Sequence, residues 1–386
     1  MIIERVVVAK FARVVNGNAF GLGKPTRYNS RRPMGQFWAL LWALALIAIV
    51  LLAACGPIVK SPLISDKAIE QEALKERFII IEQLLREEAQ LQRVAYKVMT
   101  ASTHLCPKTR GALGFTLANK FSFGSEYASA MEQLYFTDGL TVSSIVLDSP
   151  AVRAGLRAGD AILTFNGQKL GSGKDSLDHA RTVIDQRVQN TAVELQIQRN
   201  GTLYDITFEL ETACNYPVVL TNKGIINAFT DGAAISIDTG MMRFIDGDDE
   251  LAIIIGHEVA HNIMGHIPKK FANFALGGVI DLALFLTTGF QSTAFGQMSA
   301  QLLHSQGFEL EADYIGLYLT ALAGYEINNA AQLWRRMGVF HPQFVTPKTW
   351  STHPSSPERF AQLESTIAEI IQKRNAGAVL IPEGIK

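Results

Sequence analysis

The chain has 386 residues, which is enough for two or three domains and a sizeable hydrophobic core. Apolar residues make up 48% of it and charged residues 18%, with 35 Lys and Arg against 36 Asp and Glu. This composition argues against intrinsic disorder and against a nucleic-acid partner, which would require a basic surface. Three cysteines are too few for a disulfide-dense secreted scaffold.

The N-terminal segment has the features of an export signal. Residues 1–36 hold seven Lys or Arg and one Glu, and Phe37–Ala54 is an uncharged stretch of 18 residues. Such a stretch is just long enough for a transmembrane helix, but a basic start and small residues at the end are also typical of a cleaved signal. The small residues run directly into Cys55. We therefore favour cleavage over a retained membrane anchor, with Met1 or Met34 as the start.

Leu52-Ala53-Ala54-Cys55 resembles the lipobox of bacterial lipoproteins. This resemblance implies cleavage before Cys55 and acylation of its thiol, so that lipid anchors the protein to a membrane of the bacterial periplasm. Gly56 follows the cysteine, which is similar to lipoproteins sorted to the outer membrane.

A long amphipathic helix is predicted from Ser65 to about Ser102. The segment contains no Gly or Pro, and its apolar residues are spaced among Glu, Lys, Arg and Gln. Asp66 is a candidate cap for its first turn.

From Gly111 to Leu210 the sequence changes to short strands and turns. Strands are predicted at Thr141–Leu147, Ala161–Phe165, Ala192–Gln198 and Leu203–Leu210, with a hairpin turn at Asn200-Gly201 and one helix at Ser176–Arg187.

This module resembles PDZ domains. Ala112-Leu113-Gly114-Phe115 matches their carboxylate-binding loop, and the segment from Ser149 to Gly167 matches their central signature. The resemblance implies that Leu113, Gly114 and Phe115 bind the end of a peptide, which adds to the strand edge that follows. Leu177 and Ala180 are candidates for the wall of the peptide groove. The alternative is a spacer whose groove is blocked.

Cys106 and Cys214 bracket this module. In an oxidising compartment they are candidates for a disulfide that joins the two ends of the module. The alternative is two unrelated small apolar residues.

The motif His257-Glu258-Val259-Ala260-His261 carries the predicted chemistry. It lies on a helix expected from about Asp249 to Gly265, capped by an Asp of the preceding acidic turn. Residues at i and i+4 share one helical face, so both imidazoles can bind one Zn²⁺. Glu258 borders the cation instead of binding it and is placed to take a proton from an activated water.

Two imidazoles leave a zinc site short of a ligand, and a second helical segment toward Leu319 supplies candidates. Glu309 and Asp313 lie at i and i+4, and by spacing alone either carboxylate can reach the metal. Glu311 falls on another helical face and is predicted to be solvated. His266 is interpreted as a structural residue.

HExxH followed about fifty residues later by ExxAD resembles the gluzincin metallopeptidases of the HtpX and BepA type, relatives of the CAAX prenyl protease. The resemblance implies that Glu309 is the third zinc ligand and that Asp313 orients a ligand histidine. Asn227-Ala228-Phe229 matches a strand segment beside the substrate cleft. Thr352-His353-Pro354-Ser355, with Glu358-Arg359 after it, matches a segment whose histidine approaches the active site. His353 would there stabilise the negative charge of the tetrahedral intermediate, and the alternative is an ordinary loop histidine.

We therefore expect an α+β protein in four parts. These are a signal peptide at 1–54, the N-terminal helix of the peptidase domain at 55–105, an inserted β-rich PDZ domain at 106–214, and a mostly helical zinc-peptidase domain with a small sheet at 215–386. Phe271–Phe308 carries Asp281 as its single charge. Packed helices over the active site are favoured there, since the apolar stretch Phe274–Leu286 is shorter than the roughly 20 residues of a membrane span.

The predicted function is a lipid-anchored periplasmic zinc endopeptidase that acts on protein substrates recruited or gated by the PDZ groove. Family resemblance implies unfolded or misassembled envelope proteins as these substrates. The alternative from another class is a PDZ adaptor or holdase with a structural or latent metal site. Glu258 argues against it, because a structural zinc site has no need of a general base there. The oligomeric state is not predicted.

Overall fold

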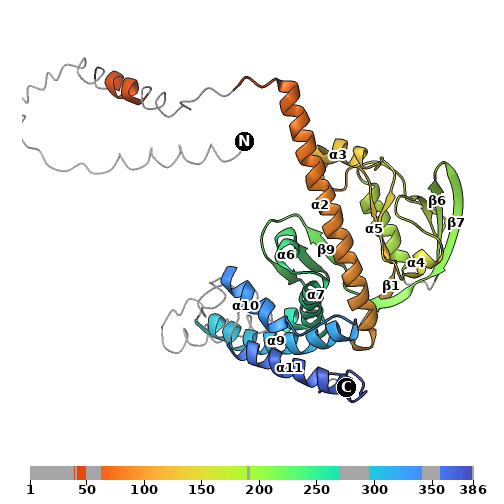
Figure 1. Cartoon of the computed structure of the whole chain (residues 1–386), viewed down its shortest axis with the longest axis vertical. Coiled ribbons are helices and arrows are strands. Elements are labelled where there is room, and N and C mark those ends of the chain that lie inside the picture. The colour runs from red at the N-terminus through yellow and green to blue at the C-terminus, as the bar shows by residue number, and fades with distance from the viewer. Residues whose placement is uncertain are drawn as a thin grey trace, which may run out of the picture. The chain divides into compact units, whose positions relative to one another are not determined.

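The computed structural model describes residue 39 and residues 41–48, 62–188, 192–269, 295–340 and 357–384, with side chains from residue 306 onward in the segment that starts at 295. It separates into two units, Met1–Ser65 and Asp66–Lys386, which are treated separately. In the first unit residues 41–48 are helical (Figure 1). Cys55 lies outside the described residues, so its acylation stays a prediction.

No helix among the described residues is both long enough and apolar enough to cross a membrane. Most of Phe37–Ala54 and the stretch Phe274–Leu286 lie outside that part of the chain. The predictions made for these two stretches are therefore untested.

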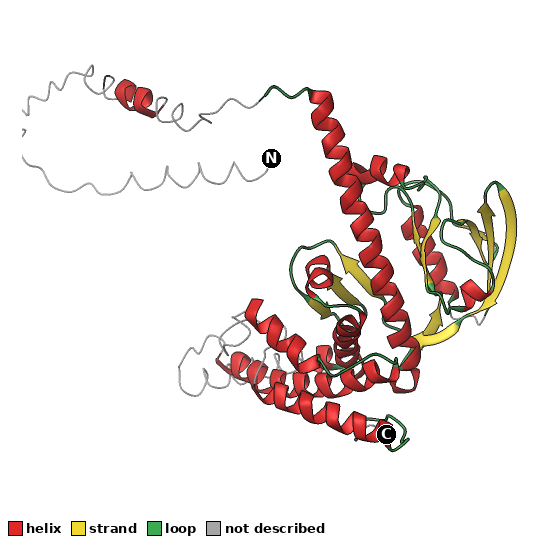
Figure 2. Cartoon of the chain, in the orientation of Figure 1, coloured by secondary structure: helices red, strands yellow, loops and turns green. Residues whose placement is uncertain are grey.

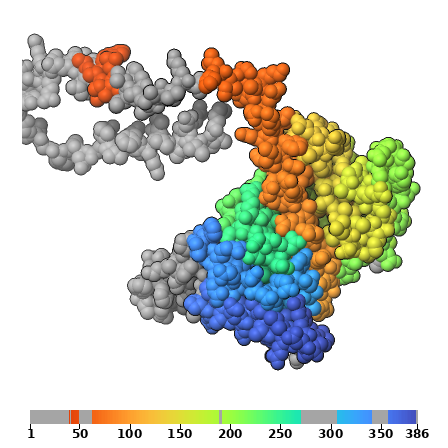
Figure 3. Space-filling model, in the orientation of Figure 1, coloured from red at the N-terminus to blue at the C-terminus, as the bar shows by residue number. Residues whose placement is uncertain are grey.

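The second unit begins with the predicted long helix, α2, which spans Asp66–Ala101. Its buried residues divide into two groups. Ile81 and Leu84 pack with Met131 of helix α3 (Ala128–Gln133), and Leu91, Val94 and Val98 enter the larger core around the zinc-motif helix. Figure 3 shows α2 in orange between the yellow segments and the green and blue ones. The helix therefore packs against both halves of this unit.

The segments coloured yellow to lime in Figure 1 form the predicted β-rich module, and Figure 2 shows its strands in yellow. Its main sheet has the order β2-β3-β4-β6-β7, with the short β5 paired to β4. These strands are β2 (Phe115–Ala118), β3 (Thr141–Ile145), β4 (Ala161–Phe165), β5 (Gln168–Lys169), β6 (Ala192–Arg199) and β7 (Thr202–Glu209). The helices α4 (Pro150–Arg153) and α5 (Ser176–Arg187) complete it. The predicted strands, the helix and the Asn200-Gly201 turn are confirmed.

The two ends of this module meet in a two-stranded ladder. β1 (Thr109–Ala112) pairs antiparallel with β8 (Glu211–Cys214). Beside it Cys106 and Cys214 form a disulfide, with Cα atoms 5.6 Å apart. The chain thus enters and leaves the module at one place.

A small sheet follows, made of β9 (Val218–Thr221), β10 (Ala228–Thr230) and β11 (Ile235–Asp238). Its order is β10-β11-β9, so β10 lies at an edge. The short helix α6 (Thr239–Phe244) leads from β11 toward the zinc-motif helix.

In the part of the chain that the structure describes, the helices that follow are α7 (Asp248–Ile263), α9 (Phe295–Leu322), α10 (Ala330–Phe340) and α11 (Pro357–Asn375). The predicted Asp cap of α7 is wrong. Gly247 occupies the cap position with no side-chain hydrogen bond, and Glu250 instead accepts a hydrogen bond from the Asp246 backbone N–H at 2.6 Å. A carboxylate one turn into the helix can do this because it reaches back to the unpaired amides of the helix start.

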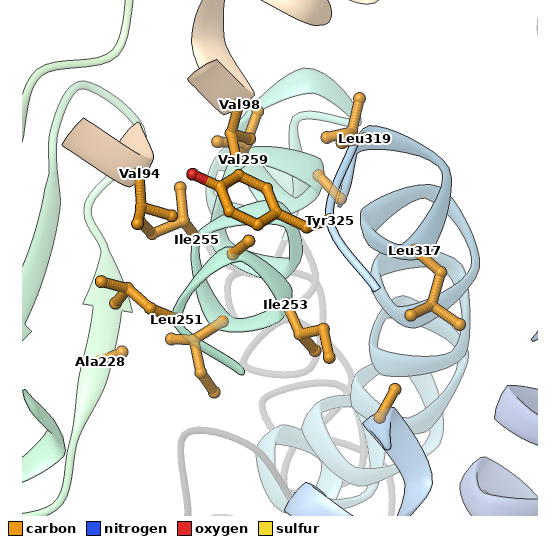
Figure 4. Packing of buried hydrophobic residues seen from close by; sticks show 14 of the residues in the cluster. Val94, Val98, Ala228, Leu251, Ile253, Ile255, Val259, Leu317, Leu319 and Tyr325 are labelled. Atoms are coloured by element: carbon orange, nitrogen blue, oxygen red, sulfur yellow. The ribbon is translucent and has the colours of Figure 1, made fainter. Parts of the chain in front are cut away.

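The core of this half surrounds α7. Figure 4 shows Leu251, Ile255 and Val259 of α7 together with Val94 and Val98 of α2. Residues of α7 are buried all around the helix, which fits a helix enclosed by other elements on every side.

Two glycines allow α7 and α9 to touch backbone to backbone. A Cβ atom on Gly256 would lie 2.6 Å from the carbonyl oxygen of Gly316, and one on Gly316 would lie 2.8 Å from the amide nitrogen of His257. Both distances are shorter than a van der Waals contact, so neither position accepts a side chain unless the helices move apart. Thr320 Oγ1 lies 3.1 Å from the Ala252 carbonyl oxygen across the same contact.

Gly316→Ala is therefore expected to separate α7 from α9 and to lower the free energy of unfolding by about 1–3 kcal/mol, the usual cost of overpacking. Gly307→Ala is the matched control, because it lies on the same helix and a Cβ atom there would have no neighbouring atom within 4 Å. It should be neutral or stabilising by up to about 1 kcal/mol, since Ala favours helix over Gly. Chemical denaturation of the metal-free proteins measures both, and equal effects would contradict the close-contact argument.

Candidate metal centre

Helix α7 brings the two predicted metal-binding histidines together. His257 and His261 lie one helical turn apart and are both buried, with their Nε2 atoms 3.1 Å from each other. Their rings meet edge to face with centroids 4.7 Å apart. Both Nε2 atoms therefore point to one small volume.

The third donor comes from α9. Glu309 Oε2 lies 3.3 Å from His257 Nε2, and Glu309 Oε1 lies 3.4 Å from His261 Nε2. Among the described residues, His257, His261 and Glu309 form the one cluster of His, Cys, Asp or Glu able to hold a metal ion. Asp313, the alternative donor by spacing, lies instead on the Nδ1 side of His257 at 2.9 Å.

These distances fit a zinc ion. Ligands bound at about 2.0–2.1 Å in tetrahedral geometry stand about 3.3–3.4 Å from one another. The two Nε2 atoms lie 3.1 Å apart, and each lies 3.3–3.4 Å from one oxygen of the Glu309 carboxylate. A set of two imidazoles and one carboxylate also matches catalytic zinc sites, which keep a fourth position open.

The pKa of His257 shows how strongly this site favours positive charge. Burial lowers that pKa, but hydrogen bonds and attraction to Asp313 and Glu309 outweigh burial and raise it to about 9. In the metal-free protein a proton is thus held where a cation would bind.

Asp313 is itself held by a buried arginine. Arg359 of α11 donates from Nε and Nη2 to the two carboxylate oxygens at 2.7 and 2.8 Å. Its guanidinium also lies 4.8 Å over the ring of Trp334 and 3.6 Å from Glu309. Burial raises the pKa of Asp313, yet Arg359 and His257 together hold it below its usual value. Arg359 thus fixes the carboxylate that orients His257.

Sequence reasoning assigned no role to Arg359. The available signal was its place in the Glu358-Arg359 pair behind the segment that contains His353. His353 itself lies outside the described residues, so its role near the site stays a prediction.

Glu258 follows His257 directly on α7 and is buried, with about 1% of its surface exposed. Glu258 is thus the neighbour of the candidate metal donor His257 in the helix. Its carboxylate also contributes to the electrostatic field around Arg359. A buried carboxylate next to a metal donor in the chain is a candidate for exchanging a proton at the open coordination position.

The edge strand β10 lies against α7. The amide of Asp238 donates to the carbonyl of Asn227 at 3.0 Å, which fixes the register of the β10–β11 pair. Hydrogen-bonded positions alternate along an antiparallel pair, so the peptide groups of Ala228 and Thr230 point away from β11. This edge of the sheet can pair with an extended chain.

The side chains of the other two predicted cleft residues, Asn227 and Phe229, contact residues in and beside the small sheet. Asn227 Nδ2 donates to Asp238 Oδ2 at 3.4 Å, and Phe229 is partly buried with the Lys223 ammonium 5.8 Å from its ring centre. The predicted position of these two side chains beside a substrate cleft stays a prediction.

The predicted peptide-binding loop lies apart from the metal site, in the β-rich module. Gly114 has φ of +72°, and a Cβ atom there would lie 2.4 Å from the Cβ of Ser149. Val146 N donates to Gly114 O, and Phe115 opposes Ile145, so the peptide group of Phe115 points to the open side of β2.

Helix α5 flanks this strand. The amide nitrogen of Gly111 donates to Val188 O at the end of α5, and Asn119 Nδ2 lies 3.0 Å from Ser176 Oγ at its start. Ala180, predicted to line a groove, is fully buried in the core of the module, because it faces the sheet. Leu177 is partly exposed at the margin of that core.

A cleft of about 210 Å³ separates this loop from α2. Leu113 and Gly114 line one side, and Tyr96 and Met99 of α2 line the other. Tyr96 donates to Glu211 at 2.5 Å, and burial followed by this carboxylate raises the pKa of the Tyr96 hydroxyl.

Two family comparisons agree with this geometry. Residues 189–367 match Peptidase family M48, and residues 111–210 match a PDZ domain. The chain thus combines a region similar to Peptidase family M48 with a region similar to PDZ domains. The predicted fold class is confirmed in this coarse form, a mixture of helices and sheets with a PDZ domain. The insertion of that domain and the predicted boundaries stay predictions.

Curated relatives of this chain include metalloendopeptidases. The chain is 30% identical over 193 residues to the mitochondrial metalloendopeptidase OMA1 of Arabidopsis thaliana, covering 49% of this chain and 39% of the relative. It is 33% identical over 157 residues to OMA1 of Schizosaccharomyces pombe, covering 38% and 45%. It is 26% identical over 149 residues to a putative beta-barrel assembly-enhancing protease of Vibrio cholerae, covering 35% and 31%. The chain thus spans less than half the length of these relatives.

Replacing Arg359 with Met should leave Asp313 as a buried, uncompensated carboxylate and lower the free energy of unfolding of the metal-free protein by about 3–5 kcal/mol. Arg335→Met is the control, since Arg335 pairs with Glu364 at the surface, where such pairs contribute at most about 1 kcal/mol. Denaturant titration in the presence of a chelator compares the two. Similar losses in both variants would show that the buried ion pair has no special role.

Proposed function

We propose that this chain is a zinc-dependent endopeptidase, lipid-anchored in the bacterial periplasm, that cleaves unfolded or misassembled envelope proteins. The observation that carries the proposal is the meeting of His257, His261 and Glu309 at tetrahedral zinc spacing, with the buried Glu258 next to them. A site that served only structure would need a fourth protein ligand and no acid–base residue.

His257, His261 and Glu309 would hold the cation. When bound, Zn²⁺ supplies Lewis-acid activation of a water and of the substrate carbonyl. Glu258 accepts the proton of the attacking water and then delivers it to the leaving amide nitrogen. Arg359, through Asp313, keeps His257 in the ring orientation that presents Nε2 to the cation.

The substrate backbone is proposed to pair with β10 at Ala228 and Thr230, whose peptide groups point away from β11 and with which no described strand pairs on that side. Such pairing requires an extended segment, which unfolded chains offer and folded domains rarely do. The relative from Vibrio cholerae is named for beta-barrel assembly, and this name supports envelope proteins as the substrate class. The PDZ loop at Leu113, Gly114 and Phe115 would recruit these substrates or gate their access.

The decisive experiment compares wild type with Glu258→Gln on an unfolded protein substrate. Loss of the general base should reduce cleavage by roughly 10²- to 10⁴-fold, while zinc content stays the same. A folded domain serves as the control substrate and should resist cleavage. Equal cleavage by both proteins, or no cleavage by either with zinc bound, rejects the enzyme and leaves a PDZ adaptor or holdase.

The proposed location has a separate test. The disulfide between Cys106 and Cys214 supports export, because such bonds persist in oxidising compartments. Mass spectrometry of the purified protein should find a chain that begins at an acylated Cys55, and Cys55→Ser should release the protein from the membrane fraction. An unlipidated chain that starts before Cys55 contradicts the anchor.

A further inference from the structure

The second metal-binding histidine is the first member of a chain of three side chains. His261 Nδ1, on the ring edge opposite the metal-facing Nε2, lies 2.8 Å from Nδ1 of His266. The other ring nitrogen of His266, Nε2, lies 2.8 Å from Glu311 Oε2. His266 is fully buried, and the side chain of Glu311 is 40% exposed.

The local backbone explains why these groups meet. Helix α7 ends at Ile263, and Gly265, with φ of +63°, turns the chain so that His266 comes back beneath His261. Phe308 of α9 stacks on the His266 ring, with centroids 4.5 Å apart and planes 20° from parallel. The imidazole is thereby held between the two helices. Glu311 is partly exposed, as predicted, but its long side chain also reaches the turn after α7, which the sequence did not predict.

The direction of the hydrogen bonds follows from the chemistry of the rings. His261 faces the other metal donors with Nε2, so its ring proton lies on Nδ1 and donates to His266. His266 accepts with Nδ1 and therefore carries its own proton on Nε2. That proton is donated to the Glu311 carboxylate, which accepts only. Each ring is fixed in a single tautomer.

We propose that His266 and Glu311 are positioning residues for the metal ligand His261. Glu311 selects the tautomer of His266, and His266 in turn fixes the ring orientation and the Nε2 lone pair of His261. This inference rests on the zinc site of the proposed function, and it assigns a role to two residues outside the HExxH and third-ligand positions.

Helix α9 supplies the carboxylates that support both histidine ligands. Glu309 binds the cation, Asp313 supports His257 directly at 2.9 Å, and Glu311, between them in sequence, supports His261 through an inserted imidazole. A carboxylate behind a metal-bound histidine raises the basicity of the ring and fixes its orientation. The support for His261 passes through His266, so it covers a longer distance than the direct contact between Asp313 and His257. It ends at the partly exposed Glu311.

The test measures zinc affinity of the purified full-length protein by competition with a coloured chelator. His266→Phe keeps a flat ring for Phe308 but removes the acceptor of the His261 proton, and Glu311→Leu removes the acceptor of the His266 proton. Each should weaken zinc binding roughly 10- to 100-fold, the usual effect of losing such a partner. Glu311→Gln keeps an acceptor oxygen for His266 and should restore affinity to within about threefold of wild type.

Two controls separate positioning from folding. Glu364→Leu removes a surface carboxylate of α11 that pairs with Arg335, and it should leave zinc affinity unchanged. Thermal unfolding of the metal-free proteins reports any purely structural role, which would lower the melting temperature without changing the zinc affinity of the folded fraction. Zinc affinity equal to wild type in both His266→Phe and Glu311→Leu overturns the proposal. Absence of zinc binding by the wild type instead rejects the proposed function itself.

Discussion

The contact between α7 and α9 is the constraint on which the metal centre depends. Helices that pack through side chains stand about 8–10 Å apart, and Gly256 and Gly316 remove the side chains that would hold these two at that distance. The backbone of α9 consequently lies against His257 itself. The Glu309 carboxylate of α9 then spans the remaining gap and meets both imidazoles.

The net negative charge buried near this contact explains why the site favours a divalent cation. Glu258, Glu309 and Asp313 carry three formal negative charges, and Arg359 returns one positive charge within the same buried cluster. Uncompensated charges cost several kcal/mol each in such surroundings. Two negative charges therefore remain to be balanced, which is the charge that Zn²⁺ carries. In the metal-free protein the same excess of negative charge raises the pKa of His257.

Local periodicity was sufficient to predict which candidate ligands share a helical face, but it contained no information on long-range packing. His257 and His261, or Glu309 and Asp313, share a face because a helix repeats about every 3.6 residues. The sequence offered no comparable rule for Arg359, which contacts Asp313 from 46 positions away, or for Glu311, which contacts His266 from 45 positions away. A helical wheel placed Glu311 off the ligand face correctly, but it contained no information on the turn that brings His266 to meet it. The choice of Glu309 over Asp313 likewise depended on the inter-helix distance and needed the family resemblance.

How a change in the PDZ domain could reach the region that matches Peptidase family M48 depends on where the chain passes from one to the other. The disulfide between Cys106 and Cys214 joins the two chain segments that pass between these regions. The two segments therefore cannot transmit a change by moving independently. Among the described residues α2 offers a route, because it lines the cleft beside the PDZ loop with Tyr96 and donates from Gln92 to the Val218 carbonyl of β9 at 2.8 Å. The same helix packs Val94 and Val98 against α7. A ligand that displaced α2 at the loop would therefore act on the sheet and on the zinc-motif helix together, and gating by the PDZ domain requires no motion of the domain as a whole.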